Sequence, residues 1–156
     1  MTLLANASLA AALMIATPTL AASSVASKDY VEIQQLYAEY NYAIDRGDAA
    51  AWADTFTSDG VFNGQFAGRE ALIGFIKLWR TSLGGADRRH WNSNLSLTPD
   101  ATGVHGEVYL LLLDVGTKPP TIRMNATYSD ELVRTPNGWR FKSRIVTEDP
   151  AKTAAK

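Results

Sequence analysis

The order of the predicted elements indicates an α+β domain in which three helices precede an antiparallel sheet. Three observations support this class. Two segments in the first half repeat apolar residues at helical spacing, a short helix with a good N-cap lies between them, and the second half alternates β segments with turns. Helices that precede a β-meander pack together on one face of its sheet. We find no internal repeat, no linker and no second domain.

The helical signals fall in the first half of the chain. The first helix is predicted over 29–46, where apolar side chains recur every three or four residues, and Gly47 ends it. Asp48 is a suitable N-cap for a second, short helix over 49–56. The third helix is predicted over 69–80.

The second half predicts a meander of four strands, preceded by one short strand. Two turns, 98–103 and 135–138, contain the proline, aspartate, asparagine and glycine that turns require. The short strand is expected to begin at 61–62, and the meander strands are expected to span 88–97, 104–115, 121–134 and 139–147.

The first meander strand is predicted to be polar on one face. Because side chains alternate across a strand, the residues of one row are His90, Asn92, Asn94 and Ser96. Trp91, Leu95 and Leu97 fall on the other row. If the polar row faces the helices, it lines a cavity.

The second meander strand is apolar on both faces. Val108, Leu110 and Leu112 alternate with Tyr109, Leu111 and Leu113. A sheet with helices on only one side should be polar on the other. We therefore expect a second subunit to cover the outer face, giving a homodimer; a helix or terminus of the same chain is the alternative.

The third meander strand carries one carboxylate within an apolar row. Asp130 interrupts the row formed by Ile122, Met124, Ala126, Tyr128 and Leu132. A carboxylate there is paired, lies at the mouth of a pocket, or is turned out by a bulge.

Asp45 and His90 are the candidate catalytic residues. Asp45 lies in the last turn of the first helix, where a carboxylate opposes the helix dipole. It could act as a general acid or base, or pair with a surface arginine such as Arg46. A histidine in a cavity near a carboxylate forms the usual proton-transfer pair, whereas a lone strand histidine is more often structural. Tyr40 and Tyr128 could donate to a substrate oxygen, although core packing is the commoner role of a tyrosine.

Composition excludes several classes of site. The chain has no cysteine, so disulfides and thiolate metal sites are excluded. A formal net charge of −1 gives no basic surplus for binding nucleic acid. Zinc-protease, phosphate-loop and dinucleotide motifs are missing. We expect no metal and no cofactor, and no segment long and apolar enough to span a membrane.

Residues 1–27 are predicted to form a signal peptide. An apolar run over 9–16 precedes small residues of the kind cut by signal peptidase, although no basic residue precedes the run. A disordered or helical tail is the alternative. The expected location is periplasmic or secreted, with one domain over 28–149 and a disordered tail over 150–156.

Several segments together resemble the SnoaL-like proteins of the NTF2-like superfamily. The resemblance lies in residues 37–48, 68–72 and 128–141, and in Arg89-His90 followed by Asn94. It implies a conical fold: a curved antiparallel sheet wrapped around three helices that encloses one pocket, usually dimeric through the convex sheet face. Members of the family include cofactor-free cyclases, dehydratases, isomerases and lyases.

The scytalone dehydratase-like branch is the most similar catalytic template. Asp45, Tyr40 and His90 match its pocket residues, whereas Ile44 replaces a tyrosine and a second histidine has no counterpart near Leu112. The sequence thus predicts a cofactor-independent lyase, dehydratase or isomerase acting on a small, largely apolar cyclic or aromatic molecule. A non-catalytic protein that binds a hydrophobic ligand is the alternative. The predicted substrate-binding residues are Tyr40, Ile44, Asn94, Tyr128 and Asp130.

Overall fold

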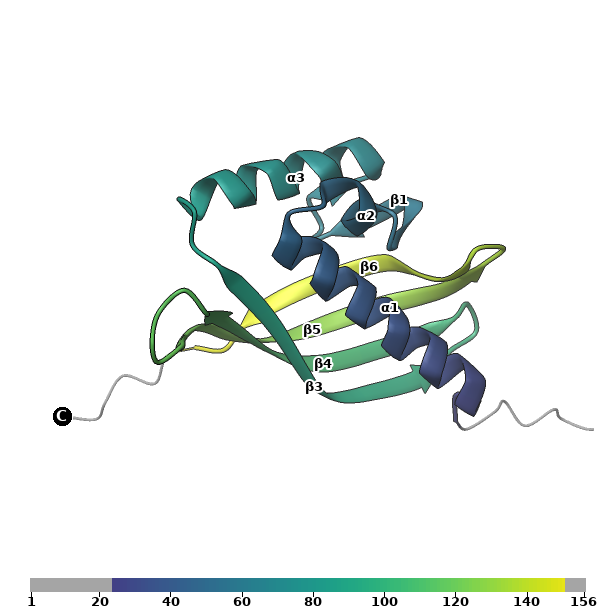
Figure 1. Cartoon of the computed structure of the whole chain (residues 1–156). Coiled ribbons are helices and arrows are strands. Elements are labelled where there is room, and N and C mark those ends of the chain that lie inside the picture. The colour runs from purple at the N-terminus through teal and green to yellow at the C-terminus, as the bar shows by residue number, and fades with distance from the viewer. Residues whose placement is uncertain (1–23, 151–156) are drawn as a thin grey trace, which may run out of the picture.

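Three helices lie on the same face of one curved sheet in the computed structural model, which describes residues 24–150 (Figure 1). This confirms the predicted α+β, NTF2-like class. The predicted signal peptide and C-terminal tail fall almost entirely outside the described residues. Export therefore stays a prediction. None of the helices in this part of the chain is long and apolar enough to cross a membrane.

The helices begin and end at the signals that the sequence contains. They are α1 (Ser27–Arg46), α2 (Ala49–Ala53) and α3 (Arg69–Ser82). Gly47 ends α1 with a φ of 72°, a left-handed conformation that glycine adopts without strain. The Asp48 side chain caps α2 by accepting a hydrogen bond from the Ala51 N–H at 3.0 Å.

The second helix is three residues shorter than predicted. It ends at Ala53, and Phe56 begins a strand that pairs with Phe141. The Phe141 N–H also donates to the Thr55 carbonyl at 3.0 Å. Pairing with a distant strand therefore overrides the local helical pattern.

The strands form a single six-stranded sheet in the order β2-β1-β6-β5-β4-β3. All neighbouring pairs are antiparallel except β1 and β6, which are parallel. That parallel pair differs from the wholly antiparallel sheet that was predicted. The strands are β1 (Phe56–Phe62), β2 (Phe66–Ala67), β3 (Arg88–Pro99), β4 (Val104–Asp114), β5 (Thr121–Thr135) and β6 (Gly138–Glu148).

Bulges change which side chains face the helices. In β3 the register shifts between Ser93 and Ser96, and Asn94 has a φ of 59°. Beyond this bulge Leu95 and Leu97 pack against the core, while Asn94 and Ser96 are exposed. The predicted polar row of β3 is therefore wrong beyond the bulge, because one extra residue reverses the alternation. A shift between Leu112 and Leu113 similarly leaves Ile122 61% exposed rather than in the inner row of β5.

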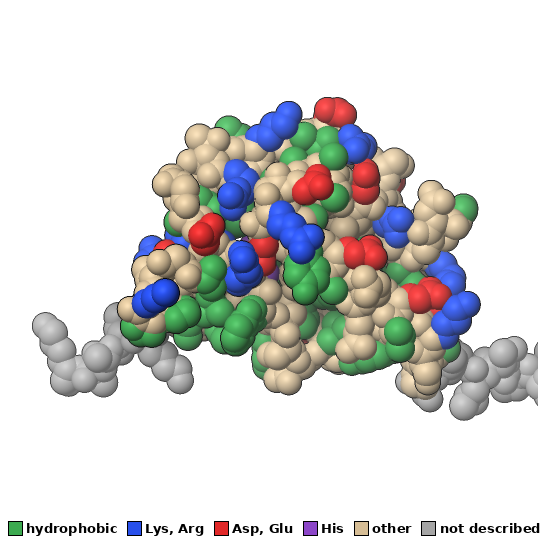
Figure 2. Space-filling model, in the orientation of Figure 1, with side chains coloured by type: hydrophobic (Ala, Val, Ile, Leu, Met, Phe, Trp, Pro, Cys, Tyr) green, Lys and Arg blue, Asp and Glu red, His purple; other side chains and the backbone are tan. Residues whose placement is uncertain are grey.

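As predicted, β4 is apolar on the outer face of the sheet, but the outward row of β5, between β4 and β6, is polar: Asn125, Thr127, Ser129 and Glu131. Trp91, Tyr109, Leu111 and Ile145 are 63%, 57%, 37% and 38% exposed, and their strand register places them on one face. In Figure 2, hydrophobic side chains gather along the lower, sheet side, whereas charged side chains cover the helix side. The described part of the chain leaves this outer patch uncovered.

Candidate active site

Asp45 and His90 form a hydrogen-bonded pair that joins α1 to β3. The Asp45 Oδ1 atom lies 2.6 Å from His90 Nδ1, and Oδ2 accepts the backbone N–H of His90 at 3.2 Å. Their side chains are only 7% and 4% exposed. The structure therefore brings together the two residues predicted to move a proton.

The pair fixes the roles of the two imidazole nitrogens. An ionised carboxylate can only accept hydrogen bonds, so opposite an ionised Asp45 the proton is carried by Nδ1 of His90. In the neutral ring, Nε2 then carries the lone pair. Within residues 24–150, no hydrogen bond is made by Nε2. It is therefore the nitrogen available to a ligand.

His90 lines a cavity of about 180 Å³ between the helices and the sheet. Three predicted substrate-binding residues, Tyr40, Ile44 and Tyr128, line it as well. Sequence reasoning did not assign the other lining residues to the site: Phe62, Asn63, Phe75, Trp79, Leu112, Met124 and Val146. The sequence placed Leu112 and Met124 in apolar strand rows, and Trp79 lies within the predicted third helix. No pattern in the sequence indicated that these residues lie near His90.

The size and chemistry of this cavity restrict its ligand. No Asp, Glu, Lys or Arg lines it, and most of its lining is aliphatic or aromatic. An engineered cavity of roughly 150 Å³ in another protein holds benzene. A neutral, single-ring group is therefore the fragment that this cavity fits.

Besides His90, the cavity lining includes two tyrosines, Tyr40 and Tyr128, which carry polar hydroxyl groups. Tyr40 and Tyr128 lie edge to face, with ring centroids 6.0 Å apart. Burial raises the pKa of both hydroxyls, against the opposing effect of the nearby Arg144 guanidinium. The buried Tyr40 hydroxyl has no hydrogen-bond partner among the described residues. Both groups therefore stay protonated.

Asp130 is a member of a buried ion pair and does not line the cavity. Its two oxygens accept hydrogen bonds from Nε and Nη2 of Arg144, both at 2.7 Å, and the Tyr37 hydroxyl also donates to it. Gly106 lies opposite Asp130, and a Cβ at that position would lie 2.7 Å from the Tyr37 hydroxyl oxygen. The prediction that Asp130 binds substrate is corrected here. Of the three alternatives for this carboxylate, pairing is the one observed.

Arg144 is a fully buried cation that the sequence did not reveal. Four rings surround its guanidinium, with centroids 3.9 to 4.7 Å from Cζ; they belong to Phe141, Tyr128, Tyr40 and Tyr37. Burial by itself would lower the pKa of Arg144, but the Asp130 carboxylate raises it above its usual range. The cation therefore sits directly beside the two tyrosines of the cavity.

Asn94 does not reach the cavity either. The bulge in β3 turns it outward, and it lines a different pocket between α1 and β3. Its predicted role beside His90 is therefore corrected, and the reason is the reversed alternation beyond Ser93.

No group of three or more His, Asp or Glu side chains that could hold a metal ion occurs between residues 24 and 150.

Comparison with known proteins shows which family this chain belongs to. Residues 25–145 match the model of the SnoaL-like domain. The chain belongs to the SnoaL-like domain family. The family includes polyketide cyclases and dehydratases, and its members bind small molecules.

Among solved structures, this SnoaL-like chain is similar to ActVI-ORFA from Streptomyces coelicolor. The TM-score is 0.73 with 26% identity, over 80% of this chain and 98% of that one. It is also similar to a Catenulispora acidiphila protein in complex with S-DNPA, at a TM-score of 0.70 and 31% identity, over 80% and 96%. An uncharacterised Mycobacterium tuberculosis protein is 28% identical over 125 residues, which cover 77% of this chain and 85% of the relative.

Proposed function

We propose that this SnoaL-like protein is a cofactor-independent acid–base enzyme of the lyase, dehydratase or isomerase type. The observation that carries the proposal is the Asp45–His90 pair, in which one ring nitrogen is held by a carboxylate and the ring lines an apolar cavity. A small, largely apolar cyclic or aromatic molecule would be the substrate. The 31% identical relative in complex with S-DNPA supports a small-molecule role for this fold.

His90 would act as the base. Its Nε2 removes a proton from a carbon next to a carbonyl group; the electron pair of the C–H bond forms a C=C bond, and the π pair of the carbonyl moves to its oxygen. Asp45 stabilises the imidazolium that forms. A positioned general base typically accelerates such a step by about 10²–10⁴-fold.

The tyrosine hydroxyls would stabilise the developing oxyanion. Tyr40 and Tyr128 both line the cavity, and the Arg144 Cζ atom lies 4.2 and 4.1 Å from their ring centroids. A donor that is already oriented and desolvated costs no reorganisation when the charge forms. Loss of one such donor typically slows the reaction by about 10²–10³-fold.

A non-catalytic binding protein is the second candidate, and one observation favours it. Asp45 also accepts the backbone N–H of His90, so the pair ties α1 to β3 as a structural link would. In that case the cavity would hold an apolar ring and leave it unchanged.

Proton exchange distinguishes the two candidates without knowledge of the natural substrate. We expect the protein in D₂O to exchange the hydrogens next to the carbonyl of hydroxylated cyclohexanones faster than buffer alone, as followed by NMR. These probes match a cavity of about 180 Å³. Broadened probe signals without exchange would reject the enzyme and support the binding protein.

We also propose that the outer sheet patch of Trp91, Tyr109, Leu111 and Ile145 pairs with a second copy of the chain. Large exposed apolar patches mark interaction sites. Light scattering should give twice the mass of one chain, and Leu111→Lys should halve it by placing a charge in the contact. Leu78→Lys is the control, because Leu78 is 70% exposed on α3. A monomeric wild type at micromolar concentration would reject the dimer.

A further inference from the structure

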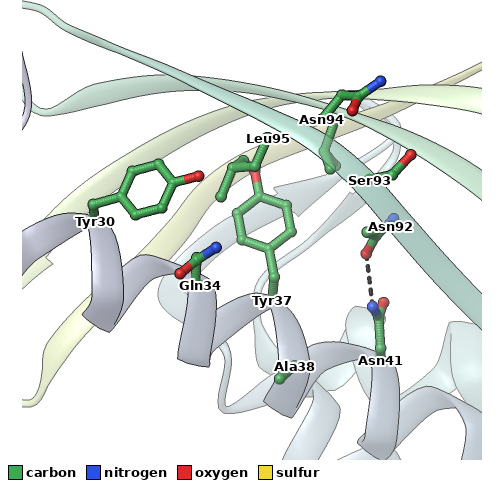
Figure 3. Close-up of a pocket in the computed structure, with 10 residues that line it drawn as sticks. Tyr30, Gln34, Tyr37, Ala38, Asn41, Asn92, Ser93, Asn94 and Leu95 are labelled. Carbon is green, nitrogen blue, oxygen red and sulfur yellow. Dashed lines mark hydrogen bonds between the residues drawn. The ribbon is translucent and has the colours of Figure 1, made fainter.

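Asn63 is the only exposed residue in the lining of the His90 cavity, so it lies where the cavity meets solvent. It is also the only side-chain amide in that lining. The amides of Asn92 and Asn94 belong to the separate pocket between α1 and β3 (Figure 3). The acid–base chemistry proposed above uses His90, its carboxylate partner and two tyrosines, and it gives Asn63 no part.

Two hydrogen bonds fix Asn63 against β6. Its backbone N–H donates to the Arg144 carbonyl, and its Oδ1 accepts the backbone N–H of Val146, both at 2.8 Å. Val146 lines the cavity as well, so the carboxamide of Asn63 lies against the cavity wall. The partner of the carboxamide is an N–H donor, so the atom that meets it is the oxygen. The Nδ2 group, which carries two N–H donors, has no hydrogen-bond partner within residues 24–150.

Asn63 and His90 lie on opposite sides of the cavity. Asn63 directly follows β1, whereas His90 belongs to β3 at the far edge of the sheet, and β6, β5 and β4 lie between them. Both nevertheless line one cavity of about 180 Å³, because the sheet curves around it. A single ring that presents a C–H group to His90 therefore has its opposite end toward Asn63.

We propose that Asn63 is a specificity-determining residue, which selects substrates that carry a second oxygen atom opposite the reacting carbon. Its Nδ2 group donates a hydrogen bond to that oxygen, and this bond holds the ring with its C–H group at Nε2 of His90. The oxygen is an ether, carbonyl or hydroxyl oxygen, since each of these accepts a hydrogen bond. This role rests on the acid–base function proposed above.

A purely structural role is the competing explanation, because Oδ1 of Asn63 already bonds to Val146. Asn63→Asp separates the two roles. A carboxylate still accepts the Val146 N–H but cannot donate to an ether oxygen. Asn63→Gly removes the donor without adding a charge, and glycine suits the φ of 52° at this position.

The test compares 4-methoxycyclohexanone with 4-ethylcyclohexanone, which share the ring and the ketone and differ by one ether oxygen in place of a CH₂ group. NMR titration gives the affinity of each probe, and the affinity ratio, methoxy over ethyl, is the readout. We expect each Asn63 variant to lower this ratio by about three- to tenfold, the contribution of one neutral hydrogen bond. A change in charge or stability that affects both probes equally cancels in the ratio.

Asn137→Asp is the matched control, because Asn137 also precedes a glycine in an exposed turn and does not line the cavity. It should keep the wild-type ratio. Urea midpoints show which variants fold, and Asn63→Gly decides if Asn63→Asp does not.

The role of Asn63 is overturned if the folded Asn63 variants keep the wild-type ratio, or if neither probe binds. Deuterium exchange of the same probes in D₂O tests the acid–base function separately. Probes that bind with a ratio lowered by the variants but exchange no hydrogen would reject the enzyme and retain Asn63 as the donor that selects the ligand.

Discussion

His90→Gln is expected to slow deuterium exchange of a cyclohexanone probe by about 10²-fold or more, because it removes the general base. Glutamine keeps similar bulk and can still donate an N–H toward Asp45, so the 2.6 Å contact between α1 and β3 has a substitute. The initial exchange rate at saturating probe is the measurement. Binding of the probe, followed by line broadening, should change little.

His105→Gln is the matched control for this substitution. His105 is the other histidine of the chain and lies exposed on β4. It should exchange the probe at the wild-type rate. Equal rates in the wild type and both variants would show that His90 is not the base.

Asp45→Asn separates catalysis from structure at the same pair. The asparagine keeps the shape of the carboxylate but loses its charge, so it no longer fixes the Nδ1–H tautomer of His90 or stabilises its imidazolium. Exchange should fall while the urea midpoint stays close to wild type. ¹⁵N chemical shifts of the His90 ring report the tautomer directly. A large loss of stability with unchanged exchange would instead identify a structural link.

Arg144→Met is expected to destabilise the fold by about 3–5 kcal/mol, because it leaves the Asp130 carboxylate buried without its partner. Both side chains are fully buried, and two hydrogen bonds of 2.7 Å join them. Urea unfolding followed by tryptophan fluorescence measures the loss. The double variant Arg144→Met, Asp130→Asn removes both charges and keeps an acceptor for Tyr37, so it should be more stable than the single variant.

Lys142→Met is the matched control on the same strand. Lys142 pairs with Asp59 at the surface, and its side chain is 40% exposed. Exposed ion pairs contribute roughly 0–1 kcal/mol. If Arg144→Met costs no more than this control, the buried network does not hold the core together.

The candidate site was partly predictable from the sequence, and the limit was strand register. Asp45 could be identified because the C-terminal turn of a helix is a local feature. His90 was identified from a polar row that is correct up to the bulge. Asn94, two residues beyond Asn92, was assigned to the wrong face, since a bulge leaves no reliable local pattern.

Arg144 was missed for the same physical reason. Phe141 and Arg144 are three residues apart, so strict alternation places them on opposite faces of β6. The register shift between Glu131 and Leu132 leaves Lys142 with no β5 residue opposite it, so Phe141 and Arg144 both point inward. From the sequence alone, a charged side chain at such a position is expected on the surface. Only the structure shows its pairing with Asp130 and the aromatic rings around it.

The sequence by itself determined the class of fold, the order of its elements, the apolar outer row of β4 and the family. These depend on periodicity, turn residues and caps, which act within a few neighbouring residues. Only the tertiary structure decided that α2 stops before Phe56, that β1 joins β6 in parallel, and that Asp130 pairs with Arg144. It also placed Asn94 outside the His90 cavity. Those features depend on contacts between residues far apart in the chain, whose register no local pattern records.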